Sequence, residues 1–230
     1  MVKSLQQGKY RQMYGKFVVE GEKLVYELLH SGFRADRIYA LDNWNCPVAG
    51  IQLTRVNEAE LERISGFSTP NKVLAVVSVP SPSVEISAED SVLVLEDIHD
   101  PGNMGTLLRT ADWFGLKHVV CSENTVDCFH PKVVQASMGS IFRVQVHVKD
   151  LPVWMPSSGK GFIAAVPDGQ TGWAEGGCAT DSLVIGSESH GISDVVLKCC
   201  KKKITIPRVG YGDSLNAAVS AGILMSRLYL

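Results

Sequence analysis

Three polar loops, each directly after an apolar run, carry the side chains that could do chemistry. The runs are "SVLVLED", "SLVIGSE" and "KITIPR", and the loops that follow contain glycine, asparagine, serine and carboxylate residues. Ligands bind outside the carboxyl ends of the strands in parallel α/β sheets. Glycine at such a strand end lets a ligand approach the backbone closely. The three loops therefore predict a ligand site built from distant parts of the chain.

The first loop continues into a helix and places Asn103, Gly105 and Arg109 in the order Asn-x-Gly-x-x-x-Arg. Asparagine supplies both a donor and an acceptor, and arginine supplies a fork of donors that binds phosphate or stabilises a developing oxyanion. An arginine solvated on a helix is the plainer interpretation of Arg109 when it is taken alone.

In the second loop a single carboxylate, Glu188, lies between Gly186 and Gly191. A glycine turn with a solvated glutamate would explain this loop equally well.

The third loop begins at Pro207, which ends the preceding strand. We expect Asp213 or Ser214 to cap the final helix, which is predicted over 215–228. Asn216 would then fall in the first turn, where its side chain can point back at the loop. Capping explains Ser214 but does not explain Asn216.

Composition sets the broad class. The chain has 230 residues, 45% hydrophobic and 20% charged, with a net charge of −2. No apolar run reaches the roughly 18 residues of a membrane span, and the basic N-terminus lacks a signal-peptide apolar core. We therefore expect a cytoplasmic protein. Common nucleotide-binding and hydrolase fingerprints, such as G-x-G-x-x-G and G-x-S-x-G, are absent.

Two features of the sequence leave alternatives open. Basic residues collect at the N-terminus (Lys3, Lys9, Arg11, Lys16, Lys23) and near the C-terminus (Lys198, Lys201 to Lys203). They are either solvated faces or phosphate contacts. The six cysteines match no zinc spacing, and the nearest approach to one is Cys121, Cys128 and His130, so we expect no metal.

The chain divides near "VPSPSVEISAED", whose prolines and serines are typical of a linker. We predict a small α/β domain over 1–80, a linker over 81–90 and a second domain over 91–230. In the second domain, apolar strands alternate with helices expected over 106–114, 132–139 and 215–228. That alternation favours a Rossmann-like parallel sheet with both faces covered.

The three loops resemble the motifs of a known family. "DPGNMGTLLRTADWFG", "GSESHG" and "IPRVGYGDSLNAAVSA" are similar to the three motifs of the SpoU (TrmH-type) RNA 2'-O-ribose methyltransferases of the SPOUT superfamily. The segments "GKFVVEGEKLV" and "STPNKVLAVV" resemble a substrate-binding domain common in that family, which would bind RNA. The resemblance covers nearly the whole chain.

The resemblance implies a function and a fold. The function is transfer of a methyl group from S-adenosylmethionine to a ribose 2'-hydroxyl of rRNA or tRNA. The catalytic domain would end in a deep trefoil knot, and the protein would be a homodimer. The implied cofactor-binding residues are Gly186, Ile206 and Leu215. The implied catalytic residues are Arg109, Asn103, Glu188, Ser214 and Asn216.

The chain departs from the family pattern at two positions. Arg208 stands where the third motif usually has methionine, and Ala217 where it often has valine. Arg208 would either add a phosphate contact or point to solvent. Neither change removes a catalytic group, so they bear, if anything, on the choice of substrate. Two alternatives remain: a SPOUT enzyme that methylates a base, and a catalytically silent RNA-binding homologue.

Overall fold

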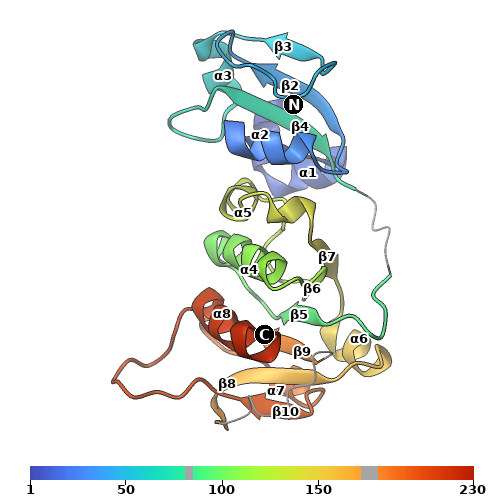
Figure 1. The fold of residues 1–230 in the computed structure, drawn as a ribbon, viewed down its shortest axis with the longest axis vertical. Helices are drawn as coiled ribbons and strands as arrows, with labels where there is room; N and C mark the ends of the chain where they lie inside the picture. The colour runs from blue at the N-terminus through green and yellow to red at the C-terminus, as the bar shows by residue number, and fades with distance from the viewer. Residues whose placement is uncertain (81–84, 172–180) are drawn as a thin grey trace.

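The protein has two sheets, stacked along its long axis (Figure 1). The structure, a computed structural model, describes residues 1–80, 85–171 and 181–230. Within these ranges no helix is long and apolar enough to cross a membrane.

The N-terminal sheet has four strands in the order β1-β4-β2-β3, of which only β2 and β3 pair in parallel. Its elements are η1 (Val2–Gln6), α1 (Gly8–Tyr14), β1 (Lys16–Glu20), α2 (Glu22–Leu29), β2 (Ala35–Ala40), β3 (Leu53–Arg55), α3 (Glu58–Ile64) and β4 (Val73–Ser78). A capping box begins α3: the Asn57 side chain accepts from the Glu60 N–H at 2.9 Å, and the Glu60 carboxylate accepts from the Asn57 N–H.

Among residues 85–171 and 181–230, the second sheet has six strands in the order β10-β8-β9-β5-β6-β7, and every pairing is parallel. Its strands are β5 (Val92–Leu95), β6 (His118–Cys121), β7 (Gln145–Val148), β8 (Phe162–Gln170), β9 (Ser182–Ile185) and β10 (Lys202–Ile204). The apolar central strands β5, β6 and β9 are fully buried. This confirms the predicted α/β class with a parallel sheet.

Helices cover both faces of this sheet. The residues of β5 alternate between the two faces. Leu93 and Leu95 pack with α4, α5 and α8, whereas Val92 and Val94 pack with α6 and α7. The helices are α4 (Pro101–Trp113), α5 (Pro131–Ala136), η2 (Ser140–Phe142), α6 (Leu151–Ser157), α7 (Asp194–Leu197) and α8 (Ala217–Leu228).

The two sheets belong to one continuous apolar core rather than to two separate ones. Phe17 of β1 packs against Phe129 with ring centroids 4.5 Å apart, and Phe33 packs against Phe142 at 5.2 Å. Buried Arg11 of α1 adds an ion pair of 2.7 Å to Asp127. The N-terminal domain therefore packs firmly against the second domain. The boundaries 1–80, 81–90 and 91–230 remain predictions, and residues 81–84 lie outside the described ranges.

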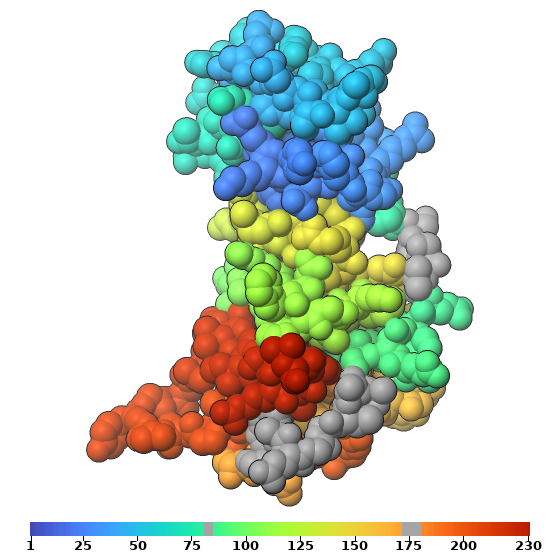
Figure 2. Space-filling view, in the orientation of Figure 1, coloured from blue at the N-terminus to red at the C-terminus, as the bar shows by residue number. Residues whose placement is uncertain are grey.

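The segment between β10 and α8 extends away from the body of the molecule (Figures 1 and 2). Its residues Val209 and Tyr211 are fully exposed. The Arg208 guanidinium donates to the Gly212 carbonyl oxygen at 3.1 Å and so closes the segment on itself. This arm is the third of the polar loops.

Candidate functional site

The ends of β5 and β9 lie next to each other because these strands pair directly. The Asn103 side chain donates to the Glu188 carboxylate, which joins the first loop to the second. The Asn216 side-chain amide donates to the Asn103 side-chain oxygen, Oδ1, at 2.8 Å, which joins the third loop to the first. Three polar side chains from three distant segments therefore meet in one hydrogen-bonded chain.

Asn103 is held in place by the start of α4. The Asp100 side chain accepts from the Asn103 N–H at 2.8 Å and Pro101 is the first helical residue, which is a favoured beginning for a helix. The helix thus begins five residues before the expected 106, and the expectation was wrong at that end. A Cβ at Gly105 would come within 2.4 Å of the Ala136 Cβ, so glycine allows α5 to pack directly on α4.

The second loop is a closed turn with Glu188 near its tip. Ser187 and Gly191 exchange backbone hydrogen bonds of 3.1 and 2.9 Å. A Cβ at Gly186 would lie 2.2 Å from the Gly191 carbonyl group, so this position must be glycine for the turn to close. A further support was not predicted: the Glu96 carboxylate accepts from the backbone N–H and hydroxyl of Ser193, at 2.9 and 2.6 Å. Glu96 directly after β5 and Ser193 directly before α7 were the sequence signals for this contact.

Asn216 is the N-cap of α8, which corrects the expectation that Asp213 or Ser214 would cap a helix over 215–228. Its side-chain oxygen accepts from the N–H groups of Ala218 and Val219 at 2.9 and 3.3 Å. Asparagine caps helices as well as serine or aspartate does. Here the cap leaves the amide nitrogen free to reach Asn103, so one side chain has both roles.

Two of the predicted catalytic residues do not join this hydrogen-bonded chain. Arg109 is exposed on α4, and at about 100° per residue it lies roughly 120° around the helix from Asn103. Ser214 is exposed on the arm. In the ranges that the structure describes, neither side chain has a hydrogen bond or ion pair with another predicted site residue.

The residues predicted to bind the methyl donor offer backbone groups beside apolar side chains. Ile206 is half-buried against the core, and Leu215 is 50% exposed next to Asn216. The N–H groups of Ile206 and Leu215 have no hydrogen-bond partner among the described residues. Free backbone donors flanked by aliphatic side chains suit a ligand with polar ring edges and an apolar ring face.

Four of the nine residues in the basic runs have acidic or carbonyl partners within the fold. Arg11 is paired with Asp127, Lys16 with Asp36 at 2.9 Å, and Lys201 with Asp181. Lys3 donates to the Ser65 carbonyl oxygen at 2.6 Å. These four cations are therefore not a free surface for phosphate.

The cysteine and histidine residues nearest to a metal pattern have other surroundings. Burial raises the pKa of Cys121 to about 12, so its thiol stays protonated at neutral pH. His130 caps α5, its Nδ1 accepting from the Lys132 N–H. Residues 1–80, 85–171 and 181–230 contain no group of three or more side chains placed to hold a metal ion.

Comparisons with known proteins match both parts of the chain. Residues 90–226 match the model of the SpoU rRNA methylase family, and residues 1–75 match the MRM3-like substrate binding domain. The chain is 30% identical to the 23S rRNA (guanosine(2553)-2'-O)-methyltransferase RlmP of Bacillus subtilis, over 98% of this chain and 93% of that protein.

Solved structures agree with these matches. A protein of Porphyromonas gingivalis assigned to the TrmH family of RNA methyltransferases superposes with a TM-score of 0.87 and 35% identity, over 99% of this chain and 94% of that one. An AdoMet-bound rRNA methyltransferase from Sinorhizobium meliloti has the same fold, with a TM-score of 0.85 and 24% identity over 99% and 92% of the two chains. The match of one family model to more than half of the chain, together with a relative of 30% identity along its length, identifies the chain as a member of the SpoU rRNA methylase family.

Proposed function

We propose that the protein transfers the methyl group of S-adenosylmethionine to a ribose 2'-hydroxyl of rRNA or tRNA. The observation that carries this proposal is the hydrogen-bonded chain of Asn216, Asn103 and Glu188 at the carboxyl edge of the parallel sheet. The relative from Bacillus subtilis, which is named a 2'-O-methyltransferase, supports the same reaction.

The methyl donor would be held by the second loop and the arm. Gly186 permits the tight second turn, while the free N–H groups of Ile206 and Leu215 would bind polar edges of the adenosyl group. S-adenosylmethionine supplies a methyl group that is already activated for transfer, so the protein's main task is to orient the acceptor.

The remaining polar residues would act on the RNA. Arg109 would bind the phosphate next to the target ribose and stabilise the oxygen as it loses its proton, since a guanidinium does not itself take up a proton. Asn103, Glu188, Ser214 and Asn216 would orient the nucleotide and the arginine. Asn103 is suited to this role because Glu188 and Asn216 fix both ends of its amide.

A labelling assay tests the reaction. Total RNA from cells that lack the gene is incubated with the protein and radiolabelled S-adenosylmethionine, and its nucleosides are then analysed by mass spectrometry. We expect one 2'-O-methylated nucleoside. A methylated base would favour the alternative SPOUT reaction, and no transfer to rRNA or tRNA would favour a silent RNA-binding protein.

We also propose that the protein is a homodimer formed through α4 and α8. These helices lie side by side in the same direction, with Asn103 near Asn216 and Thr110 near Gly222. Their exposed side includes Trp113, which is 84% exposed, together with Val219 and Ile223. Large exposed apolar groups on adjacent helices are typical of an interface. Analytical ultracentrifugation should give a dimer that Trp113→Glu converts to a monomer; a monomeric wild-type protein would contradict the proposal.

Three further features remain proposals. The trefoil knot is supported by the path of the chain, which leaves the edge strand β10 through the arm and returns to pack α8 on α4. The division at 81–90 is supported by the separate sheets on either side of it. The cytoplasmic location is supported only by the sequence features given above.

A further inference from the structure

A cavity of about 390 Å³ lies where the N-terminal domain meets the second domain. It is lined by the first part of α2 and by one residue of the second domain: Glu22, Lys23, Leu24, Tyr26, Glu27 and Met138. A cavity of this volume can take a small organic group. None of its residues belongs to the site described above.

The turn that carries Met138 is strained. Met138 has a φ of 50° and Gly139, which follows it, has a φ of 95°. A left-handed residue other than glycine costs on the order of 1–3 kcal/mol and persists only where the surrounding structure imposes it. A Cβ at Gly139 would lie 2.8 Å from the Glu27 Cγ, so the turn is pressed closely against α2. The result is a methionine side chain, 43% exposed, held at the edge of the cavity.

The same turn lies alongside the stretch of α4 that contains Arg109. A Cβ at Gly105 would be 2.9 Å from the Ser137 nitrogen, and seven residues later the Asp112 carboxylate accepts from the Ser140 hydroxyl at 2.8 Å. On α4, Arg109 lies between Gly105 and Asp112 and on the same side of the helix as both. In the turn, Met138 lies between Ser137 and Ser140. The turn that carries Met138 therefore packs on the side of α4 to which Arg109 belongs.

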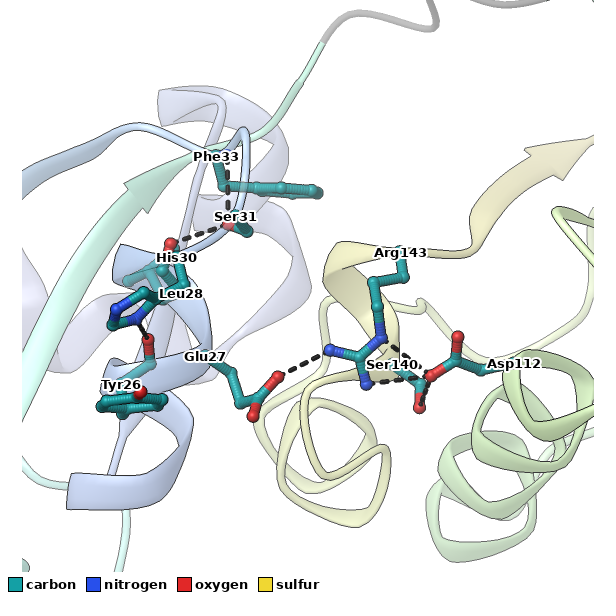
Figure 3. Close-up of polar contacts among 9 residues, drawn as sticks. All are labelled: Tyr26, Glu27, Leu28, His30, Ser31, Phe33, Asp112, Ser140 and Arg143. Carbon is teal, nitrogen blue, oxygen red and sulfur yellow. Dashed lines mark hydrogen bonds and ion pairs between the residues drawn. The ribbon is translucent and has the colours of Figure 1, made fainter. Parts of the chain in front are cut away.

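The acidic side chains that line the cavity are engaged in ion pairs. Glu22 is paired with Lys72 at 3.1 Å, and Glu27 with Arg143 at 2.6 Å. Figure 3 shows the Glu27 carboxylate reaching the Arg143 guanidinium, which also binds Asp112 on α4. Both acidic side chains of the lining are thus paired with a cation, and Glu27 shares its cation, Arg143, with Asp112.

Two cations remain available. Lys23 and Arg109 are exposed, and neither has an ion pair with a described residue. A phosphate backbone that crosses this face would meet the positive charge of Lys23 in the lining and that of Arg109 on α4.

We propose that the cavity binds the base of an unpaired nucleotide that neighbours the methylated one, with the base packed between Tyr26 and Met138 and its phosphate near Lys23. Tyr26 is 48% exposed, and its ring packs against the ring of His30 with a centroid distance of 4.2 Å. Bases stack on aromatic side chains with little dependence on sequence, and a thioether makes favourable contact with a ring. The inference rests on the proposed function for the substrate class, RNA, and adds a second point of recognition to it.

Binding can be tested without any methyl transfer. The protein is labelled with 13C in the methyl groups of its six methionines, and the Met138 resonance is assigned with Met138→Leu. Each of the four ribonucleoside monophosphates is then added to about 10 mM, well above a millimolar Kd. We expect the Met138 resonance alone to shift in the direction of a ring current, and S-adenosylhomocysteine to leave it in place. An unchanged Met138 resonance with all four nucleotides would overturn the proposal.

Steady-state kinetics on RNA from cells without the gene give the second test. Tyr26→Ala and Met138→Gly should each raise KM for RNA about tenfold, the lower part of the range for removing a stacking partner. Both should leave kcat and S-adenosylhomocysteine affinity unchanged. Met138→Gly should not lower thermal stability, because glycine relieves the positive φ. The matched control is Val153→Ala, which removes an exposed apolar group from α6.

The outcomes separate this inference from the proposed function. A normal KM in both variants, with transfer intact, overturns the base-binding cavity and leaves the methyltransferase standing. A shifted Met138 resonance in a wild-type protein that transfers no methyl group supports the cavity and overturns the reaction.

Discussion

The Asn216 amide nitrogen lies 2.8 Å from the Asn103 side-chain oxygen, although 113 residues separate them in the chain. The same Asn216 side chain caps α8, and Asn103 in turn donates to Glu188. The beginning of the last helix and the alignment of the polar site are therefore fixed by one residue. A change at Asn216 can affect either role, and suitable substitutions separate the two.

Asn216→Asp should fold normally but transfer methyl groups poorly. Aspartate caps a helix as well as asparagine does, but it places a carboxylate oxygen where the donor to Asn103 stood. Asn103 would lose its alignment toward Glu188, and a small misplacement of a catalytic group can cost about a hundredfold in rate. Thermal denaturation and single-turnover methyl transfer measure the two effects.

The matched control for the cap is Asn57→Ala. Asn57 caps α3 in the N-terminal domain through the same kind of hydrogen bond. Both Asn57→Ala and Asn216→Ala should lose about 1 kcal/mol of stability, but only the second should lose transfer. Full activity in Asn216→Asp would show that the contact with Asn103 is unimportant.

Gly186→Ala should abolish binding of S-adenosylhomocysteine. The added Cβ would lie 2.2 Å from the Gly191 carbonyl group, so the second loop must open before any ligand is present. Isothermal titration calorimetry measures the binding. Gly32→Ala is the control, since a Cβ there meets nothing within 4 Å. Normal affinity in Gly186→Ala would remove the second loop from the donor site.

Much of the fold was predictable because both faces of the central sheet are covered. Strands such as β5 and β9 are continuous apolar runs between polar loops, and this pattern survives in the sequence. The elements that were not predicted, among them β7 and α7, are short, and β7 is a half-exposed edge strand. The earlier start of α4 is signalled in the sequence by Asp100, a favoured N-cap residue, followed by Pro101.

The site was less predictable than the fold. Asn103, Glu188 and Asn216 were selected from local patterns and a family resemblance, but their contact depends on strand order and on the packing of α8. The turn at Met138 falls where the sequence analysis expected a helix as far as residue 139, whereas α5 ends at Ala136. A left-handed methionine cannot be read from a sequence because the conformation is imposed by the contact of Gly139 with α2.

The protein should lose stability as the pH falls below about 6.5, through a pair of histidines. His118 and His147 are joined by a hydrogen bond of 3.1 Å between their rings. Burial lowers the pKa of His118, with Asp90 opposing and Lys160 adding to the effect. Burial and the neighbouring His118 lower the pKa of His147.

Because both pKa values are lowered in the folded state, acid should favour the unfolded state. Unfolded histidines have a pKa of about 6.5, so on acidification the unfolded state takes up protons before the folded state does. The free energy of unfolding should be unaffected by this pair well above that pH, should decrease between about pH 6.5 and the lowered folded-state pKa values, and should level off below them. Urea denaturation between about pH 8 and pH 5 measures it, the range in which histidines titrate.

Replacing both histidines with glutamine should flatten this dependence. The pKa of His130 is also lowered by burial, so a smaller slope remains. His99→Gln, at an exposed position, is the control. An equal slope in the double variant and the wild-type protein would exclude the pair as its source.

Arg109→Ala should leave folding and donor binding intact and should nearly stop methyl transfer. The side chain is exposed and has no ion pair with a described residue, so its removal costs the fold little. If it binds the phosphate and stabilises the ribose oxygen, the single-turnover rate should fall by roughly a hundredfold or more, the effect of losing one donor to the transition state. Arg109→Lys should restore little, because a point charge cannot replace the bidentate fork. Arg37→Ala, at an exposed position in the N-terminal domain, controls for the loss of one positive charge. Saturating RNA in both assays removes differences in binding, so near-normal transfer by Arg109→Ala would make this arginine an ordinary surface residue of α4.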